Sequence, residues 1–78
     1  MDGVTFPEGT EFRKIYKHKE YRAEVRAGAL CHDGIAYKSP SAVAKAITGT
    51  NVNGWSWWES RMPGQADWRL IDELRPRE

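Results

Sequence analysis

A strict alternation over residues 20–27 constrains the fold more than any other feature of this sequence. Apolar side chains alternate there with charged ones, at Tyr21, Ala23, Val25 and Ala27 against Glu20, Arg22, Glu24 and Arg26. A period of two with one charged face is typical of a half-buried antiparallel strand. The sequence therefore predicts a sheet that has one face against a hydrophobic core and the other toward solvent.

Three further strands are predicted beside this one, at Thr10–Lys17, Ala29–His32 and Ile35–Lys38. The polar residues 17–19 suit a turn between the first two strands, and Gly28 separates the second from the third. Asp33 and Gly34 form the strongest hairpin signal, because a two-residue type I′ turn needs positive φ and this pair tolerates it. We therefore expect a four-stranded antiparallel meander.

A helix is predicted directly after the fourth strand. Ser39 can cap the exposed amide groups, Pro40 loses no hydrogen bond at the first helical position, and Gly49 can end the helix. The helix, from Ser39 to Thr48, carries one apolar stripe made of Pro40, Val43, Ala44 and Ile47. We expect this stripe to lie close against one face of the sheet.

The chain after this helix is expected to close the core. An aromatic segment occupies residues 55–58, and a last helix is predicted at about Asp67–Leu74. The side chains expected to dock that helix are Trp68, Leu70, Ile71 and Leu74. The chain has 78 residues, which fit one α+β domain. We expect a flexible segment at residues 1–8 and a single domain at residues 9–78.

The sequence lacks the residue patterns of several functional classes. Its one cysteine, Cys31, allows no internal disulfide, and a reducing compartment is the simpler interpretation. Cys31, His32 and Asp33 are adjacent, but no second pair of ligands accompanies them, so we expect no metal site. Neither His18 nor His32 belongs to a recognisable catalytic arrangement, and no phosphate-binding glycine run is present. We expect a cytoplasmic, non-catalytic protein without a cofactor, a signal peptide or a membrane span.

Positive charge is concentrated in the first half of the chain, although the net charge is only +1. Between Glu11 and Arg26, six lysines and arginines stand against three acidic residues. Arg13, Arg22 and Arg26 are expected on the sheet face opposite the helix. One interpretation is a positive surface that binds phosphates, and the other is the ordinary charged face of an exposed sheet.

The start of the predicted helix also allows two interpretations. Ser39 can simply cap the helix, or the same amide groups can attract an anion, because the N-terminus of a helix carries a partial positive charge. Lys38 precedes the cap, Ser41 adds a hydroxyl group in the first turn, and Lys45 lies one turn further along. A phosphate at this position would therefore find a cation within reach.

The segment Asn53–Trp58 contains three indoles in four positions. If it is extended, Trp55 and Trp57 share one face and Trp58 takes the other, so at least one ring is a candidate for the surface. An exposed indole beside basic side chains is a usual stacking surface for an unpaired or flipped base. The alternative is that the rings cover the ends of a small core. Asn53 contacts a base in the first case and is only a turn residue with left-handed backbone in the second.

A series of short motifs follows a fixed order along most of the chain. They are Gly9-Thr10, Tyr21, Asp33-Gly34, Ser39–Ala42, Gly49, Asn53–Trp55 and Trp68, within roughly residues 9–75. This ordered set resembles the RAMA domain, the restriction enzyme and adenine methylase associated domain, and related bacterial domains of unassigned function. RAMA-like domains are joined to restriction endonucleases, DNA methyltransferases and nucleases, so the resemblance implies recognition of DNA, including modified DNA. No catalytic domain accompanies the motifs here, so we expect a free-standing protein or an excised module.

Two functions are therefore expected. The first is a DNA-binding module associated with restriction-modification or nuclease systems, with phosphates held by Arg13, Lys17, Arg22, Arg26, Lys38 and Lys45. Its site is expected at the helix edge, formed by Lys38, Ser39, Ser41, Lys45, Asn53 and Trp55 or Trp57. The alternative is a protein-interaction module in which exposed tryptophans and arginines act as anchors. Its partner would be a separate protein or an attached enzyme domain.

Overall fold

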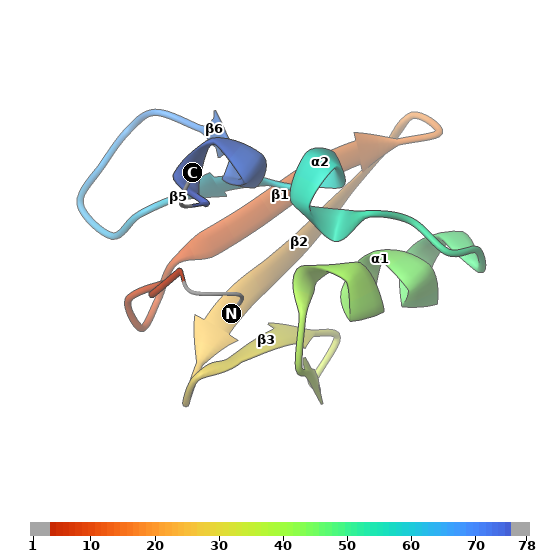
Figure 1. Ribbon diagram of the computed structural model, residues 1–78, viewed down its shortest axis with the longest axis horizontal. Helices are drawn as coiled ribbons and strands as arrows, with labels where there is room; N and C mark the ends of the chain where they lie inside the picture. The colour runs from red at the N-terminus through yellow and green to blue at the C-terminus, as the bar shows by residue number, and fades with distance from the viewer. Residues whose placement is uncertain (1–3, 76–78) are drawn as a thin grey trace.

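The structure is a computed structural model that describes residues 4–75, and it has an α+β fold (Figure 1). Within these residues a six-stranded antiparallel sheet has the order β4-β3-β2-β1-β5-β6. The strands are β1 (Glu11–Tyr16), β2 (Lys19–Arg26), β3 (Ala29–His32), β4 (Ile35–Tyr37), β5 (Glu59–Arg61) and β6 (Arg69–Leu70). The helices are α1 (Pro40–Thr48), α2 (Gly54–Trp57) and the 3₁₀ helix η1 (Ile71–Leu74).

The predicted four-stranded meander is confirmed as β1 to β4. Its strands are joined by two-residue turns in which both residues have positive φ, as a type I′ turn requires. Asp33 and Gly34 have φ of 50° and 78°. The turn between β1 and β2 contains no glycine, and Lys17 and His18 adopt φ of 51° and 66°. Lys17 and His18 therefore adopt a left-handed backbone conformation that is uncommon for residues other than glycine.

The predicted first helix is confirmed as α1, together with both of its ends. The Ser39 hydroxyl accepts a hydrogen bond from the amide of Ala42 at 3.1 Å, and Pro40 occupies the first turn. Gly49 ends the helix at φ 77°, and its N–H donates to the carbonyl of Lys45 at 2.8 Å. Of the predicted stripe, Pro40, Val43 and Ala44 are buried and Ile47 is partly buried. None of the helices in the described part of the chain is long and apolar enough to cross a membrane.

The predicted last helix is confirmed over Ile71–Leu74 only, as η1, and its predicted start at Asp67 is wrong. Residues 69–70 form β6, which pairs with β5, and only Ile71–Leu74 turns as a 3₁₀ helix. Pairing with a sheet edge overrides helix propensity here, and the amide of Ile71 donates to the carbonyl of Trp58 at 3.0 Å. Ile71 is fully buried as expected, but Trp68 is partly exposed and stacks on arginines instead of docking a helix.

The N-terminal residues 4–8 are part of the domain, which corrects the expectation of a flexible segment at residues 1–8. Val4 and Phe6 are buried, and the Phe6 ring meets that of Phe12 edge-on at 5.2 Å. The Glu8 carboxylate accepts a hydrogen bond from the amide of Ala27 at 2.8 Å. Residues 1–3 and 76–78 lie outside the described chain. Two apolar side chains ahead of β1 thus add to the core.

The hydrophobic core lies between one face of the sheet and the helices. Strand register directs Phe12, Ala23, Val25 and Leu30 to this inner face, because Phe12 pairs with Ala23 and Val25 with Leu30. The other buried apolar residues of the core come from the N-terminal segment and the helices: Val4, Phe6, Val43, Ala44, Trp55, Trp57, Trp58 and Ile71. The opposite, outer face of the sheet carries the charged residues of the alternation.

The junction between α1 and α2 is unusually close. Gly54 lies directly against the peptide that joins Pro40 to Ser41, where a Cβ atom would overlap the Pro40 carbonyl group and the Ser41 amide nitrogen. The Ser41 hydroxyl accepts a hydrogen bond from the amide of Gly54 at 2.9 Å. The buried indole of Trp58 donates to the carbonyl of Pro40 at 3.0 Å. Backbone atoms of the two helices therefore touch with no side chain between them.

Gly54→Ala is expected to destabilise the domain by at least about 2 kcal/mol, because overpacking against rigid backbone typically costs ~1–3 kcal/mol. Gly34→Ala is the matched control. Its Cβ meets nothing within 4 Å but must adopt φ 78°, which costs about 1 kcal/mol. Urea unfolding of the two variants measures the difference. A Gly54→Ala variant as stable as Gly34→Ala would contradict the close junction.

Candidate functional site

The polar groups at the start of α1 are engaged by other groups of the same chain. Both hydroxyl groups expected to meet a phosphate are engaged with backbone amides, Ser39 with that of Ala42 and Ser41 with that of Gly54. Pro40 is buried beneath the junction with α2. Of the two interpretations of this helix start, capping alone accounts for the geometry, and the two serines leave the candidate site.

The aromatic segment is buried, with Trp55 and Trp57 in α2 and Trp58 directly after it, so of its two interpretations the structure agrees with the one in which the rings belong to the core. The Asn53 side chain caps α2 by accepting from the amide of Trp55 at 3.1 Å, and its φ of −75° is not left-handed. This cap starts a helical turn that carries the rings into the core. Trp55, Trp57 and Trp58 are only 3%, 9% and 0% exposed. Asn53, Trp55 and Trp57 therefore do not form a stacking surface for a base.

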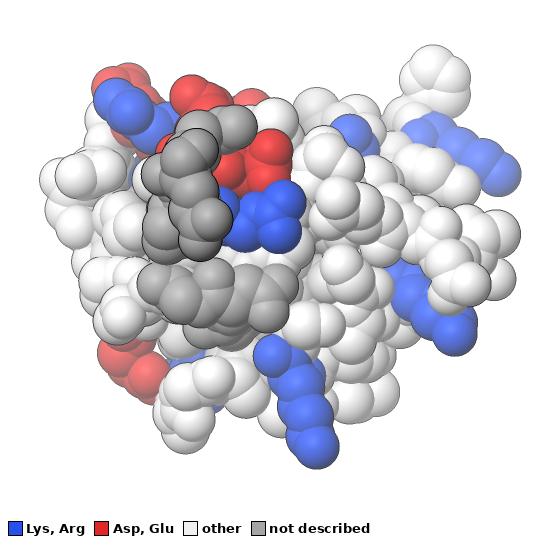
Figure 2. All heavy atoms as spheres, viewed as in Figure 1, with Lys and Arg blue, Asp and Glu red and all other residues white. Residues whose placement is uncertain are grey.

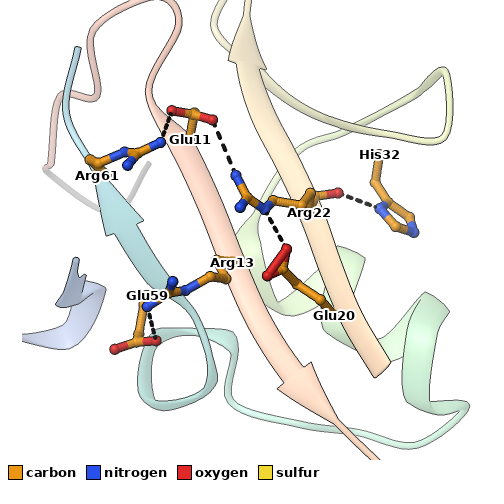
Figure 3. A network of polar contacts seen from close by, with 7 residues as sticks. All are labelled: Glu11, Arg13, Glu20, Arg22, His32, Glu59 and Arg61. Carbon is orange, nitrogen blue, oxygen red and sulfur yellow. Dashed lines mark hydrogen bonds and ion pairs between the residues drawn. The ribbon is translucent and has the colours of Figure 1, made fainter. Parts of the chain in front are cut away.

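The outer face of the sheet is a neutral network (Figure 3), which agrees with the interpretation as the ordinary charged face of an exposed sheet and not with that as a positive surface. Glutamates pair there with Arg13, Arg22, Arg26 and Arg61. The pairs are Arg13–Glu59 at 3.5 Å, Arg22–Glu20 at 2.9 Å, Arg22–Glu11 at 3.3 Å, Arg26–Glu24 at 2.6 Å and Arg61–Glu11 at 2.8 Å. Four arginines meet four glutamates, so the charges cancel. The sequence did not show the part of this network that Glu59 and Arg61 contribute, because β5 was not predicted.

Trp68 covers part of this network. Its ring centroid lies 4.2 Å from Cζ of Arg13, 4.6 Å from that of Arg61 and 5.3 Å from that of Arg22. Guanidinium groups are attracted to an indole face by its quadrupole. The three arginines are therefore held between carboxylates and one aromatic ring.

Cys31 does not converge with His32 and Asp33, although Nε2 of His32 lies 3.5 Å from Oδ2 of Asp33. Cys31 and His32 are adjacent in β3 and point to opposite faces of the sheet. The Nδ1 atom of His32 lies 2.8 Å from the carbonyl oxygen of Arg22. No group of three or more histidine, cysteine or acidic side chains is placed to hold a metal within residues 4–75.

The lysines have a different environment from the arginines. No ion pair within the described residues involves any of the five lysines of the chain: Lys14, Lys17, Lys19, Lys38 and Lys45. Lys14 and Lys19 fall on the helix-bearing face by register, because Lys14 pairs with Tyr21 and Lys19 with Tyr16. We call these five residues the lysine face.

In the view of Figure 2, basic and acidic side chains lie mostly on different halves of the molecule. In Figure 2, basic side chains project from the half of the molecule that holds α1 and the β1–β2 turn. Acidic side chains gather on the other half, most of them toward β5, β6 and η1. Lys45 is exposed on α1, and Lys38 immediately precedes its N-cap. Three of the residues predicted to hold phosphates, Lys17, Lys38 and Lys45, thus remain in the candidate site, and Lys14 and Lys19 join them there.

Lysine and aromatic side chains are interleaved at the β1–β2 hairpin. The Nζ atoms of Lys17 and Lys19 lie 5.5 and 5.2 Å from the ring centroids of Tyr16 and Tyr21. The Nζ atom of Lys14 lies 5.5 Å from the ring of Trp57. We call Lys14, Tyr16, Lys17, Lys19 and Tyr21 the hairpin patch. The signal for it is present in the sequence, because a two-residue turn at positions 17–18 places Lys14 opposite Tyr21 and Tyr16 opposite Lys19.

Glu11→Gln is expected to destabilise the domain at pH 7, and this effect should be smaller at pH 3. A hydrogen bond from Arg61 and the charges of Arg61 and Arg22 hold the pKa of Glu11 below its usual 4.5, against a smaller opposing effect of burial. Because the pKa of Glu11 is lower in the folded state than in the unfolded state, its charged carboxylate stabilises the fold at pH values above the unfolded-state pKa. This stabilisation is lost as the pH falls through the folded-state pKa. Because the pairs are exposed, the effect at pH 7 should stay below about 1 kcal/mol.

Urea unfolding at both pH values measures this dependence. Glu73→Gln is the control, because Glu73 is exposed and has no ion pair among the described residues. The role assigned to the Glu11 carboxylate would be wrong if the two variants showed the same pH dependence.

Comparison with known proteins identifies one family. No curated protein and no solved structure matches the chain. A family model described as "Protein of unknown function (DUF2924)" matches residues 2–61, which include β1 to β5, α1 and α2. The match covers well over half of the chain, and the chain therefore belongs to the DUF2924 family of proteins of unknown function.

Proposed function

We propose that this domain is a non-catalytic nucleic-acid-binding module whose interface is the lysine face. One observation carries the proposal, namely the different environments of the arginine and lysine side chains. The arginines of the outer sheet face are paired with glutamates, whereas all five lysines are without an ion pair among the described residues.

Unpaired ammonium groups are suited to phosphates for an energetic reason. A protein that neutralises phosphates releases condensed counterions, and this release supplies most of the non-specific affinity for nucleic acid. To bind a phosphate, a paired arginine must first break its ion pair with a carboxylate, whereas a lysine exposed to water loses only its hydrating water molecules. The domain measures 28 × 28 × 23 Å, so one face spans about eight base pairs at 3.4 Å each. Five lysines on such a face are enough for several simultaneous phosphate contacts.

The resemblance to the RAMA domain gives weaker support. It is the basis for proposing DNA, including modified DNA, and an association with restriction-modification or nuclease systems. Its motifs have structural roles in this chain, since Ser39 caps α1, Asp33-Gly34 forms a turn and Gly54 packs at the junction. They therefore support a shared fold more than a shared ligand contact. A cytoplasmic location, where the free thiol of Cys31 would stay reduced, belongs to the same proposal.

Protein interaction is the second candidate function, and one observation favours it. Trp68 is the one tryptophan that is not buried, all four lying within residues 4–75, and it lies over Arg13, Arg22 and Arg61. Tryptophan and arginine are enriched at the energetic centres of protein interfaces. The partner, a separate protein or an attached enzyme domain, would then contact the outer face and not the lysine face.

Replacing lysine pairs is expected to weaken nucleic-acid binding and reduce its dependence on salt. The variants are Lys17→Gln with Lys19→Gln, and Lys38→Gln with Lys45→Gln. Each lost phosphate contact lowers the slope of log affinity against log salt by about 0.7–0.9. Each double variant should therefore lower it by about 1.4–1.8. Fluorescence anisotropy with labelled oligonucleotides between about 50 and 200 mM salt measures both quantities.

Arg22→Gln with Arg26→Gln is the matched control, because it removes two positive charges from the outer face. It should leave the salt slope unchanged. If the arginine variant loses as much affinity as the lysine variants, the interface is the outer face. If no oligonucleotide binds below ~100 µM at low salt, the upper range of non-specific affinity, the protein-interaction function replaces this proposal.

A further inference from the structure

We infer that the hairpin patch stacks unpaired bases, so that the ligand of the lysine face is single-stranded nucleic acid. This inference rests on the proposed function and adds the ligand class. Its basis is the placement of two partly exposed tyrosine rings beside three lysines at the edge of the part of the sheet that the helices cover.

The two rings lie at the edge of the helical cover of the inner face. Tyr16 and Tyr21 lie on the same face of the sheet as Phe12 and Ala23, which are buried. Figure 1 shows the β1–β2 turn extending past α2, away from the middle of the sheet. Tyr16 and Tyr21 are accordingly only partly buried, at the edge of the core. The end of the inner face therefore exposes aromatic surface to solvent.

The rings are held in place by their neighbours. The centroids of Tyr16 and Tyr21 lie 6.4 Å apart, and that of Tyr16 lies 5.8 Å from that of the buried Trp57. A supported ring loses little conformational entropy when a base stacks on it. Lys17 and Lys19 lie within 5.5 Å of the same two rings. A nucleotide whose base stacks on either tyrosine would thus have an ammonium group near its phosphate.

This arrangement favours a single strand over a duplex. Bases of a duplex are stacked on one another, and an outside ring cannot reach their faces without unstacking them. Proteins that bind single strands combine a positive groove with aromatic rings on which successive bases stack. Tyr16 and Tyr21 pack against the edge of the core instead of projecting as a wedge. They are therefore suited to a strand that is already unpaired.

The first test compares a thymidine oligonucleotide of about 12 nucleotides, within the usual site size for single strands, with a duplex of equal length. Wild-type protein should bind the single strand more tightly. Tyr16→Leu and Tyr21→Leu should each weaken single-strand binding by about 5- to 100-fold, the range for one lost stacking contact, and leave the salt slope unchanged. Tyr16→Phe and Tyr21→Phe keep the ring and should bind within about 2-fold of wild type. Tyr37→Leu, a partly buried tyrosine outside the patch, is the matched control.

The second test uses the wild-type protein alone, so its result does not depend on whether the leucine variants fold. Titration of wild-type protein with the thymidine oligonucleotide should move the ring-proton resonances of Tyr16 and Tyr21 upfield, and leave those of Tyr37 in place. The inference is overturned if these resonances do not move, if the leucine variants that fold bind as wild type does, or if the duplex binds more tightly. Those outcomes leave the proposed function standing when the lysine variants still lose affinity. The proposed function fails together with the inference if no oligonucleotide binds.

Discussion

The contact of Gly54 with the Pro40–Ser41 peptide is the constraint on which the rest of the structure depends. It fixes how closely α2 approaches α1, and the indole of Trp58 then reaches the carbonyl of Pro40 from the centre of the core. β5 begins at the next residue, Glu59, and pairs with β1. The position of the second half of the sheet therefore follows from one backbone contact that only glycine permits.

The charge distribution is a consequence of that placement. β5 brings a glutamate and an arginine beside β1, where Glu59 meets Arg13 and Arg61 meets Glu11. Exposed pairs of this kind stabilise a protein little. Their larger effect is to neutralise the outer face, so that a chain with a net charge of only +1 still presents a positive surface elsewhere. The planar arginine groups suit the paired face, and the flexible, hydrated lysines remain on the other.

Several residues that the sequence offered as ligand contacts have structural roles instead. Asn53 caps α2, Ser41 accepts from the amide of Gly54, and the neighbouring indoles fill the core. A small domain needs such large side chains in its core because it has few aliphatic residues to bury. The tyrosines at the end of the hairpin are left partly exposed because they pack at the edge of the core. Aromatic content alone could not distinguish these two groups of rings.

The sequence by itself determined the elements that depend on near neighbours. The meander β1 to β4, the Asp33-Gly34 turn and α1 with its caps at Ser39 and Gly49 follow from alternation, turn chemistry and capping within a few residues. Only the tertiary structure decided that residues 69–70 pair as a strand, that the indoles point inward and that the arginines are paired. Arg13 meets a carboxylate 46 residues away, and Arg61 meets one 50 residues away. No local pattern encodes such contacts, because they form only when β5 packs beside β1.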